Sequence, residues 1–187
     1  MQLKNLALAS VAATTSLALP ATTSIADGTT FALITYKDGE LLGNAGVQAA
    51  LRSLFVNLPS QNATCGDNPD PNFATFYLND QELNLFGYQR GNQQKIFVDR
   101  SGMGMGKIGY ITGSEGLGRY WETQGWTLND NQLLFKGTAL QACPNSIDGG
   151  WSLWLQGVAK PGYNENCTPV VVTALETPDP IGCFYKN

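Results

Sequence analysis

The sequence contains no histidine, and charged residues make up only 14% of its 187 residues. Without histidine, the chain lacks the usual general base of a serine or cysteine hydrolase and the commonest metal ligand. The 11 Lys and Arg residues are scattered and outnumbered by 15 Asp and Glu, which gives a net charge of −4. A protein that neutralises phosphates needs a basic patch, so nucleic acid is not an expected partner. We expect no metal or cofactor site and no catalytic residues.

Beyond its first residues the chain also lacks a long apolar run. Residues 6–19 are apolar or small and follow a lone Lys4, a pattern typical of a secretory signal peptide. No later stretch approaches the roughly 18 apolar residues that a transmembrane helix needs. The last residues, IGCFYKN, do not form the hydrophobic tail of a lipid-anchor signal. We therefore expect a secreted protein without a membrane anchor.

The signal peptide is expected to be removed by cleavage after Ala26. Ser24 and Ala26 satisfy the small-x-small rule for cleavage. Competing small residues are Ala18 and Ala21. Residues 1–26 would then be the signal peptide and residues 27–187 the mature chain, whose length fits one domain with a single core.

Four cysteines are present, but none lies in a CxxC pair, so a redox or zinc motif has little support. An even number behind a signal peptide predicts two disulfides, for which three pairings are possible. We expect Cys65 to pair with Cys143 and Cys167 with Cys183, because the last two are close in sequence and flank one strand.

Two sequons predict N-linked glycan in a secretory pathway that glycosylates. Asn62 begins the first, NAT, and Asn166 begins the second, NCT. Asn62 is the better candidate because the polar stretch 60–72 is typical of an exposed loop, whereas Asn166 precedes a cysteine expected to be disulfide-bonded.

The hydrophobic pattern predicts an all-β domain. Helical periodicity is almost absent, and short alternating runs rich in Val, Ile, Phe, Tyr and Trp recur between clusters of Gly, Asn, Asp and Pro. The expected strands cover residues 31–36, 54–58, 74–78, 82–86, 95–99, 107–112, 126–128, 132–136, 140–143, 151–156, 169–175 and 182–185.

An internal repeat suggests how these strands are arranged. The segment FYLNDQELNLFG, from Phe76 to Gly87, matches WTLNDNQLLFKG, from Trp126 to Gly137, at an offset of 50 residues. Each predicts a hairpin with an Asn-Asp turn, and ITYKDGELLG, from Ile34 to Gly43, is a weaker third copy. Three hairpins at similar intervals predict a β-trefoil; a β-sandwich or an irregular β-barrel is the alternative.

The segment IFVDRSGMGMGKIGYIT, from Ile96 to Thr112, resembles a phosphate-binding loop only superficially. A P-loop needs four residues between its first glycine and Gly-Lys, followed by Ser or Thr, but Ser101 takes the place of that glycine and Ile108 follows the lysine. The glycines are therefore expected to form a turn or bulge between two strands. Asp99 and Arg100 are expected to act as an ion pair and turn stabiliser.

Two constellations could still carry a function. Trp151, Leu153 and Leu155 should share one face of a strand, which leaves Trp154 as the aromatic expected to be exposed. Trp154, with Tyr120 and Trp121, could form a platform that stacks on sugar rings, or these residues could be a second packed layer. The acids whose convergence would suggest a hydrolase are Asp80, Asp99, Glu115, Glu122 and Asp130.

The run IFVDRSGMGMGKIGYITG, the later LQACPNSIDGGWSLW and the four cysteines resemble the PhiA-type fungal cell wall proteins, which are linked to phialide and conidium development. More distantly, KIGYI, GWTL, NQLLF, QACP, WSLWLQ and NCTPVVV resemble the four-cysteine C-terminal domain of yeast Pir cell wall mannoproteins, without the N-terminal glutamine repeat of that family. The resemblance implies a secreted, glycosylated, non-enzymatic structural wall protein of conidium-forming cells, from a family that includes fungal allergens. The alternatives are a carbohydrate-binding module for glucan, chitin or mannan, and a small hydrolase or inhibitor.

Overall fold

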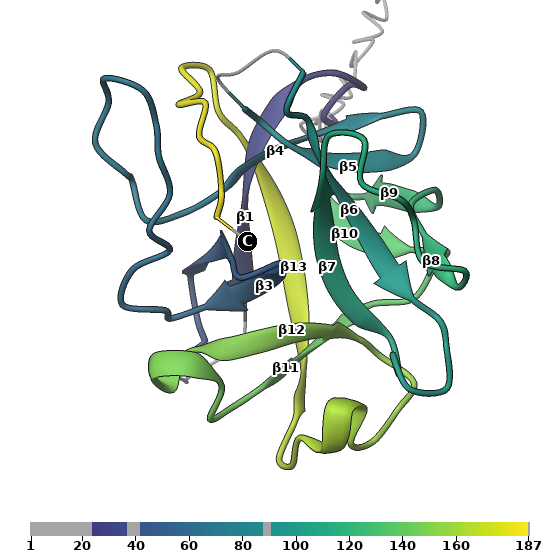
Figure 1. Cartoon of the computed structure of the whole chain (residues 1–187). Coiled ribbons are helices and arrows are strands. Elements are labelled where there is room, and N and C mark those ends of the chain that lie inside the picture. Colours follow the sequence, from purple (N-terminus) through teal and green to yellow (C-terminus); the bar gives the residue numbers. More distant parts are fainter. Residues whose placement is uncertain (1–23, 37–41, 88–90, 187) are drawn as a thin grey trace, which may run out of the picture.

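The computed structural model describes residues 24–36, 42–87 and 91–186, and the chain there forms a single all-β domain (Figure 1). Two short 3-10 helices, η1 (Ile147–Gly149) and η2 (Pro161–Tyr163), interrupt the strands. The strands are β1 (Thr30–Tyr36), β2 (Ala45–Ala50), β3 (Ser53–Val56), β4 (Thr75–Asn79), β5 (Glu82–Leu85), β6 (Gln94–Asp99), β7 (Lys107–Thr112), β8 (Trp121–Glu122), β9 (Trp126–Asn129), β10 (Gln132–Phe135), β11 (Leu140–Cys143), β12 (Trp151–Leu155) and β13 (Thr168–Glu176).

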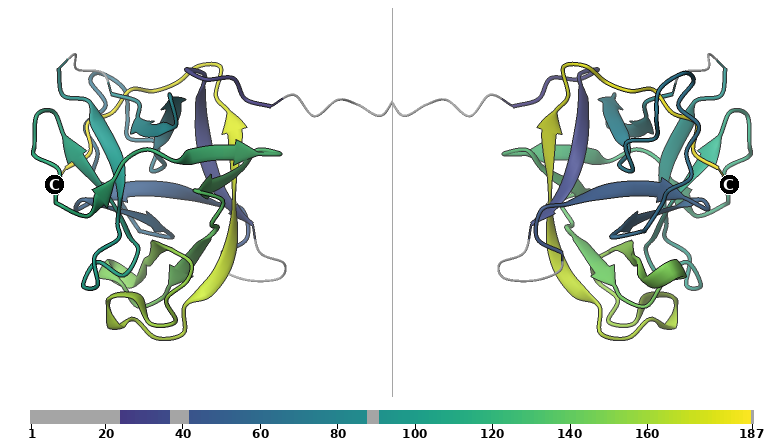
Figure 2. Two further views of the ribbon diagram at one scale, coloured as in Figure 1. Left: turned by 90° about the vertical axis from the view of Figure 1, so that its right-hand side faces the viewer. Right: turned by 90° about the vertical axis from the view of Figure 1, so that its left-hand side faces the viewer.

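The strands make one large antiparallel sheet, in the order β3-β2-β1-β4-β5-β6-β7-β12-β11-β13-β10-β9, with β8 beside β6. Additional pairings of β1 with β13 and of β3 with β12 tie distant parts of this order together. The longer of these two is the pairing of β1 with β13, which runs from Phe31↔Glu176 to Tyr36↔Val171 and joins the two ends of the domain. Figure 2 shows β1 and β13 running side by side while β2 turns away from them.

Both copies of the repeat form hairpins, as predicted. Strands β4 and β5 pair through Asn79↔Glu82, and β9 and β10 pair through Gln132↔Asn129. The two turn residues have positive φ in each case, 50° and 60° in the first hairpin and 48° and 63° in the second. Positive φ at both positions defines a type I′ turn, whose twist matches that of antiparallel strands.

The trefoil prediction is not confirmed. Strand β13 pairs with β1, β10 and β11, and the turn of the third proposed hairpin lies outside the described residues. Two strands were missed, namely β2, whose sequence AGVQAA has little β propensity, and the two-residue β8. The strand predicted over residues 182–185 is wrong, because only the bridge between Thr64 and Phe184 forms there.

The predicted disulfide pairing is also wrong. Cys65 bonds to Cys183, and Cys143 bonds to Cys167. The C-terminal segment does not return to the loop that contains Cys167. It crosses the domain instead and exchanges two backbone hydrogen bonds between Thr64 and Phe184, of 2.9 and 2.7 Å, which brings Cys183 beside Cys65.

This C-terminal segment is part of the core. Tyr185 is fully buried, and its phenol oxygen accepts a hydrogen bond from the Thr75 N–H at 3.2 Å. The Gln94 side chain both donates to the Tyr185 carbonyl at 2.7 Å and accepts from its N–H at 2.9 Å. Tyr110, also fully buried, donates to the Lys186 carbonyl at 2.6 Å. The buried polar groups of the segment thus have partners, as a dry interior requires.

Candidate functional site

The glycine-rich segment is the turn between β6 and β7, as predicted. Asp99 stabilises it by accepting hydrogen bonds from the Ser101 N–H at 2.9 Å and from the indole N–H of Trp121 at 3.1 Å. A Cβ on Gly104 would overlap the Asp99 carboxyl group, whereas one on Gly102 would meet nothing within 4 Å. A glycine is therefore needed at position 104 because the Asp99 carboxyl group occupies the space that a Cβ would take, whereas the surroundings of Gly102 would accept a side chain.

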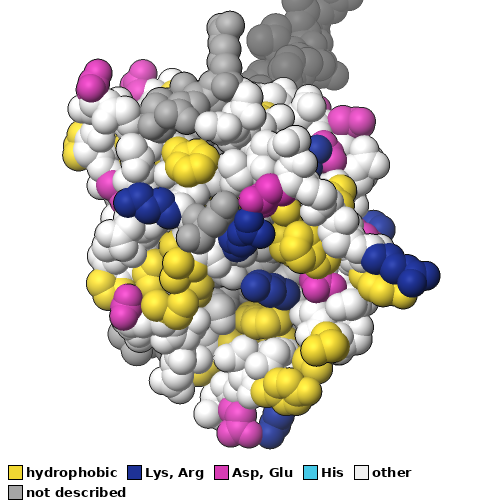
Figure 3. Space-filling view, in the orientation of Figure 1, with side chains coloured by type: hydrophobic (Ala, Val, Ile, Leu, Met, Phe, Trp, Pro, Cys, Tyr) yellow, Lys and Arg dark blue, Asp and Glu magenta, His cyan; other side chains and the backbone are white. Residues whose placement is uncertain are grey.

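Four side chains on neighbouring strands form a row on the outer face of the sheet. Trp121 lies opposite Asp99, Asp99 opposite Lys107, and Lys107 opposite Trp154. Directly opposed residues in antiparallel strands project to the same face. Figure 3 shows hydrophobic and basic side chains close together over the middle of this face. The row brings the two predicted platform tryptophans onto one surface, separated by an acid and a base.

Trp121 does not offer a free ring face. Its indole stacks on Phe97 with ring centroids 3.9 Å apart and an interplanar angle of 4°. A Cβ added to Gly118 would approach atoms of the same indole to 2.8 Å, so Gly118 also packs closely against it. Phe97 in turn covers Gly109, where a Cβ would come within 2.7 Å of the phenyl ring. Trp121 is therefore a packed residue that anchors the 113–120 loop to the sheet.

Trp154 is half-buried rather than exposed, so the prediction that it is the exposed aromatic is wrong. Its indole N–H donates to the Ser152 hydroxyl at 2.9 Å, and a Cβ on Gly162 would lie 2.6 Å from the outer edge of the ring. The loop that contains η2 covers this edge. Leu153 and Leu155 do occupy the buried face of β12, as predicted, and Trp151 packs against the core.

Two tyrosines, rather than the tryptophans, present exposed rings in this part of the molecule. Tyr120 is 51% exposed, and the guanidinium of Arg119 lies 5.3 Å from its ring centroid. Tyr163, at the end of η2, is 84% exposed and has a φ of 63°. Left-handed backbone costs a residue with a Cβ on the order of 1–2 kcal/mol. The alternation of residues along strands could not predict the exposure of Tyr163, because this residue lies in a loop.

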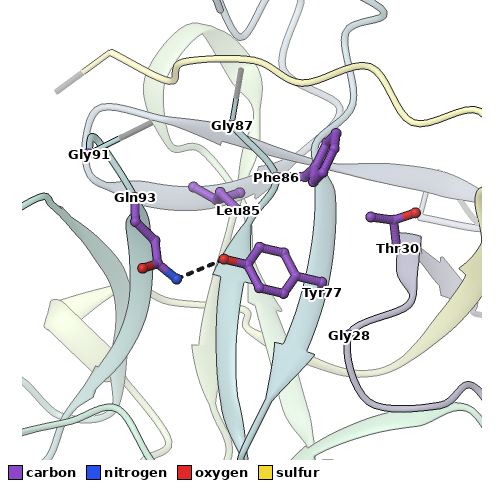
Figure 4. Close-up of a pocket in the computed structure, with 8 residues that line it drawn as sticks. All are labelled: Gly28, Thr30, Tyr77, Leu85, Phe86, Gly87, Gly91 and Gln93. Carbon is purple, nitrogen blue, oxygen red and sulfur yellow. Dashed lines mark hydrogen bonds between the residues drawn. The ribbon is translucent and has the colours of Figure 1, made fainter. Parts of the chain in front are cut away.

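A cavity of about 350 Å³ is lined by residues of β1, β4 and β5 and of the segments next to them (Figure 4). Tyr77 and Gln93 face each other there and form a hydrogen bond of 2.7 Å. Gly87 and Gly91 also line it, and the residues between them lie outside the described part of the chain. A second cavity, of about 300 Å³, is lined by the β6–β7 turn and the residues after β12, with Arg100 at its edge.

The acids that were considered for hydrolysis have structural partners. Glu115 forms an ion pair with Arg52, and Glu122 forms one with Lys136 at 2.7 Å. Asp99 accepts the hydrogen bonds of the β6–β7 turn described above, and the last two of the five acids, Asp80 and Asp130, occupy the type I′ turns. No cluster of three His, Cys, Asp or Glu residues suited to a metal occurs among the described residues, and no helix there is long and apolar enough to span a membrane. Arg100 forms no ion pair with Asp99, so only the turn-stabilising half of that prediction holds.

Both sequon asparagines are exposed. Asn62 lies in the loop between β3 and β4, with a φ of 51°, and Asn166 lies between η2 and β13, with a φ of 57°. Asn166 immediately precedes the Cys143–Cys167 disulfide. Either side chain is accessible to a glycosyl-transferring enzyme, so glycosylation at both sites stays a prediction.

The family model described as "PhiA-like secreted protein" matches residues 31–186. The chain is 45% identical over 183 residues to a cell wall protein phiA of Emericella nidulans, covering 96% of this chain and 99% of the relative. The protein of the same name from Aspergillus niger is 46% identical over 189 residues, and that from Aspergillus fumigatus is 42% identical over 189 residues, each with full coverage of both chains. No solved structure matches the chain.

Proposed function

This chain belongs to the family of PhiA-like secreted proteins, and we propose that it is a non-enzymatic, structural component of the wall of conidium-forming cells. That it is a secreted cell wall protein follows from its full-length similarity to proteins of that name. The resemblance to PhiA-type proteins, which are linked to phialide and conidium development, supports the proposed role in conidium-forming cells. The ion pairs of Glu115 and Glu122, with the absence of histidine from the sequence, support a role without catalysis.

Non-covalent contact with wall polysaccharide, whether glucan, chitin or mannan, would retain such a protein in the wall. Covalent attachment, as expected from the motifs that resemble Pir mannoproteins, is the other route, but the glutamine repeat associated with it in that family is absent from this sequence. Sequential extraction of isolated walls separates the two routes. Release by denaturant alone fits non-covalent retention, whereas release only after glucanase or chitinase digestion contradicts it.

Deletion of the gene tests the developmental role. We expect phialides and conidia with altered wall morphology, and restoration when the intact gene is returned. Normal phialides and conidia in the deletion strain would overturn this part of the proposal. Incubation of the purified protein with wall polysaccharides should release no sugar, and detectable release would contradict the non-enzymatic assignment.

A further inference from the structure

We propose that the loop of residues 157–167 is a sugar-binding loop, in which the ring of Tyr163 stacks on a pyranose unit of a neutral wall polysaccharide. This inference rests on the proposed function, because it names the site through which the wall protein would contact polysaccharide. It replaces the platform expected from the sequence, since Trp121 is packed on both faces and Trp154 is partly covered by this loop.

The loop is held rigidly. The Cys143–Cys167 disulfide joins its end to β11, and the Gln141 side chain donates a hydrogen bond of 3.0 Å to the Val158 carbonyl near its start. Between these points, the Asn164 side chain donates to the Pro161 carbonyl at 2.8 Å, and Pro161 itself is buried. Because the loop is fixed before a ligand arrives, ordering it costs little on binding.

The base of the loop rests on an aromatic ring. Gly162 packs against the edge of Trp154 so closely that a Cβ would come within 2.6 Å of the ring. Trp154 is fixed in turn by its hydrogen bond to Ser152. The Gly162 contact therefore sets the height and direction of the residue that follows it, which is Tyr163.

Tyr163 has features that packing does not explain. Its side chain is 84% exposed, and its backbone adopts a φ of 63°, which β-carbon-bearing residues rarely adopt. Among the described residues with positive φ it is the one aromatic; most of the others are Asn, Asp or hairpin-turn residues. Strain held at a position with no packing role is a feature of binding sites. A glycine there would remove the strain but also the ring.

The surroundings of Tyr163 favour a sugar as the ligand. A tyrosine ring has a negative face that attracts the C–H groups of a pyranose, and its hydroxyl can bond to a sugar hydroxyl. The two charged side chains of the loop, Lys160 and Glu165, neutralise each other at 2.7 Å, and the exposed apolar side chains beside them, Val158 and Ala159, are small. The protein carries a net charge of −4, which disfavours acidic polysaccharides. A neutral polymer fits a single exposed ring on a loop whose two charges cancel.

Binding of the mature secreted protein to purified insoluble β-glucan, chitin and mannan tests the inference. We expect the wild type to bind at least one polymer with little change between low and high salt. Tyr163→Ala should lower the affinity roughly tenfold or more, and Tyr163→Phe should keep most of it, because the ring makes the main contact. Tyr120→Ala removes the exposed ring of the platform expected from the sequence, and it should bind like the wild type if Tyr163 makes the contact; a loss of binding in Tyr120→Ala alone would place the site at Tyr120 instead.

The outcomes separate this site from the proposed function. If the wild type binds none of the purified polymers, or binds only walls that retain their proteins, polysaccharide is not the partner. Non-covalent retention by polysaccharide and the Tyr163 site are then both wrong. If the wild type binds and Tyr163→Ala binds equally well, the site is wrong while the proposed function stands. Loss of binding in Tyr163→Phe, or in high salt alone, would also overturn stacking on a neutral sugar. Unchanged circular dichroism and melting of each variant would show that the fold is intact.

Discussion

The two disulfides should contribute unequally to stability, because they close loops of very different length. Cys65–Cys183 closes a loop with a sequence separation of 118 residues and fixes the C-terminal segment in the core. Cys143–Cys167 closes a separation of 24 residues and fixes a surface loop to β11. Replacing each pair by alanine removes one cross-link at a time. Alanine is suitable because three of the four cysteines are buried and none of them is free.

The magnitude follows from the entropy that each cross-link removes from the unfolded chain. The loop-closure relation gives about 4.9 kcal/mol for the separation of 118 residues and about 3.5 kcal/mol for that of 24. The difference is about 1.4 kcal/mol, and it depends on loop length alone. Because a domain is typically stable by about 5–15 kcal/mol, loss of the longer bridge removes a large share of the total.

Equilibrium unfolding in guanidinium chloride, followed by the fluorescence of the four tryptophans, measures both losses. With a slope of about 4 kcal/mol/M, the midpoint should fall by about 1.2 M without Cys65–Cys183 and by about 0.9 M without Cys143–Cys167. An equal or larger loss for the shorter bridge would refute the reasoning. Peptide mapping without reduction provides an independent check, because a peptide containing Cys65 must be recovered bonded to one containing Cys183.

Three further predictions concern single residues. Gly104→Ala should destabilise the domain by about 1–3 kcal/mol, because its Cβ would overlap the Asp99 carboxyl group. Gly102→Ala is the control: a Cβ there meets open space and should change the free energy of unfolding by less than about 0.5 kcal/mol in the same denaturation assay. Burial raises the pKa of Tyr110 and Tyr185 above the ordinary 10.0, so the folded state favours the protonated phenols. Their contribution to the free energy of unfolding is complete below pH 10 and should be lost as the pH rises further. A spectrophotometric titration that ionised both phenols near pH 10 in the folded protein would contradict this. Tyr163→Gly should leave the melting temperature unchanged or raise it, because glycine adopts positive φ without steric cost; a clear fall would show that the side chain stabilises the fold.

The parts of the fold that local sequence determines could be predicted. Short polar turns force positive φ on two successive residues, and Asp130-Asn131 supplies side chains that tolerate it, so the hairpin β9–β10 follows from a four-residue pattern. Likewise, the alternation of Leu153 and Leu155 gives the buried face of β12 directly. The turn formed by the glycine-rich segment was also predicted, because that segment lacks the spacing of a phosphate-binding loop.

The features that depend on chain crossing could not be predicted in this way. Proximity in sequence favoured a bond between Cys167 and Cys183, but β13 lies between them and carries Cys183 to the other part of the domain, where it meets Cys65. The prediction that Trp154 is exposed was wrong for a similar reason. Strand alternation placed it on the outer face, yet it could not reveal that a loop folds back and places Gly162 against the ring.

The two disulfides therefore serve different parts of the molecule. Cys65–Cys183 holds a segment whose Tyr185 fills the core, and a small secreted domain needs this kind of constraint because its core alone supplies little surplus stability. Cys143–Cys167 holds a loop whose exposed tip contributes almost nothing to the core. Its loop-closure contribution stabilises the domain without burying apolar groups at the tip. The same cross-link also suits a loop that presents Tyr163 in a fixed orientation to an insoluble polymer, because a rigid ring loses less entropy when it stacks on a sugar than a mobile one does.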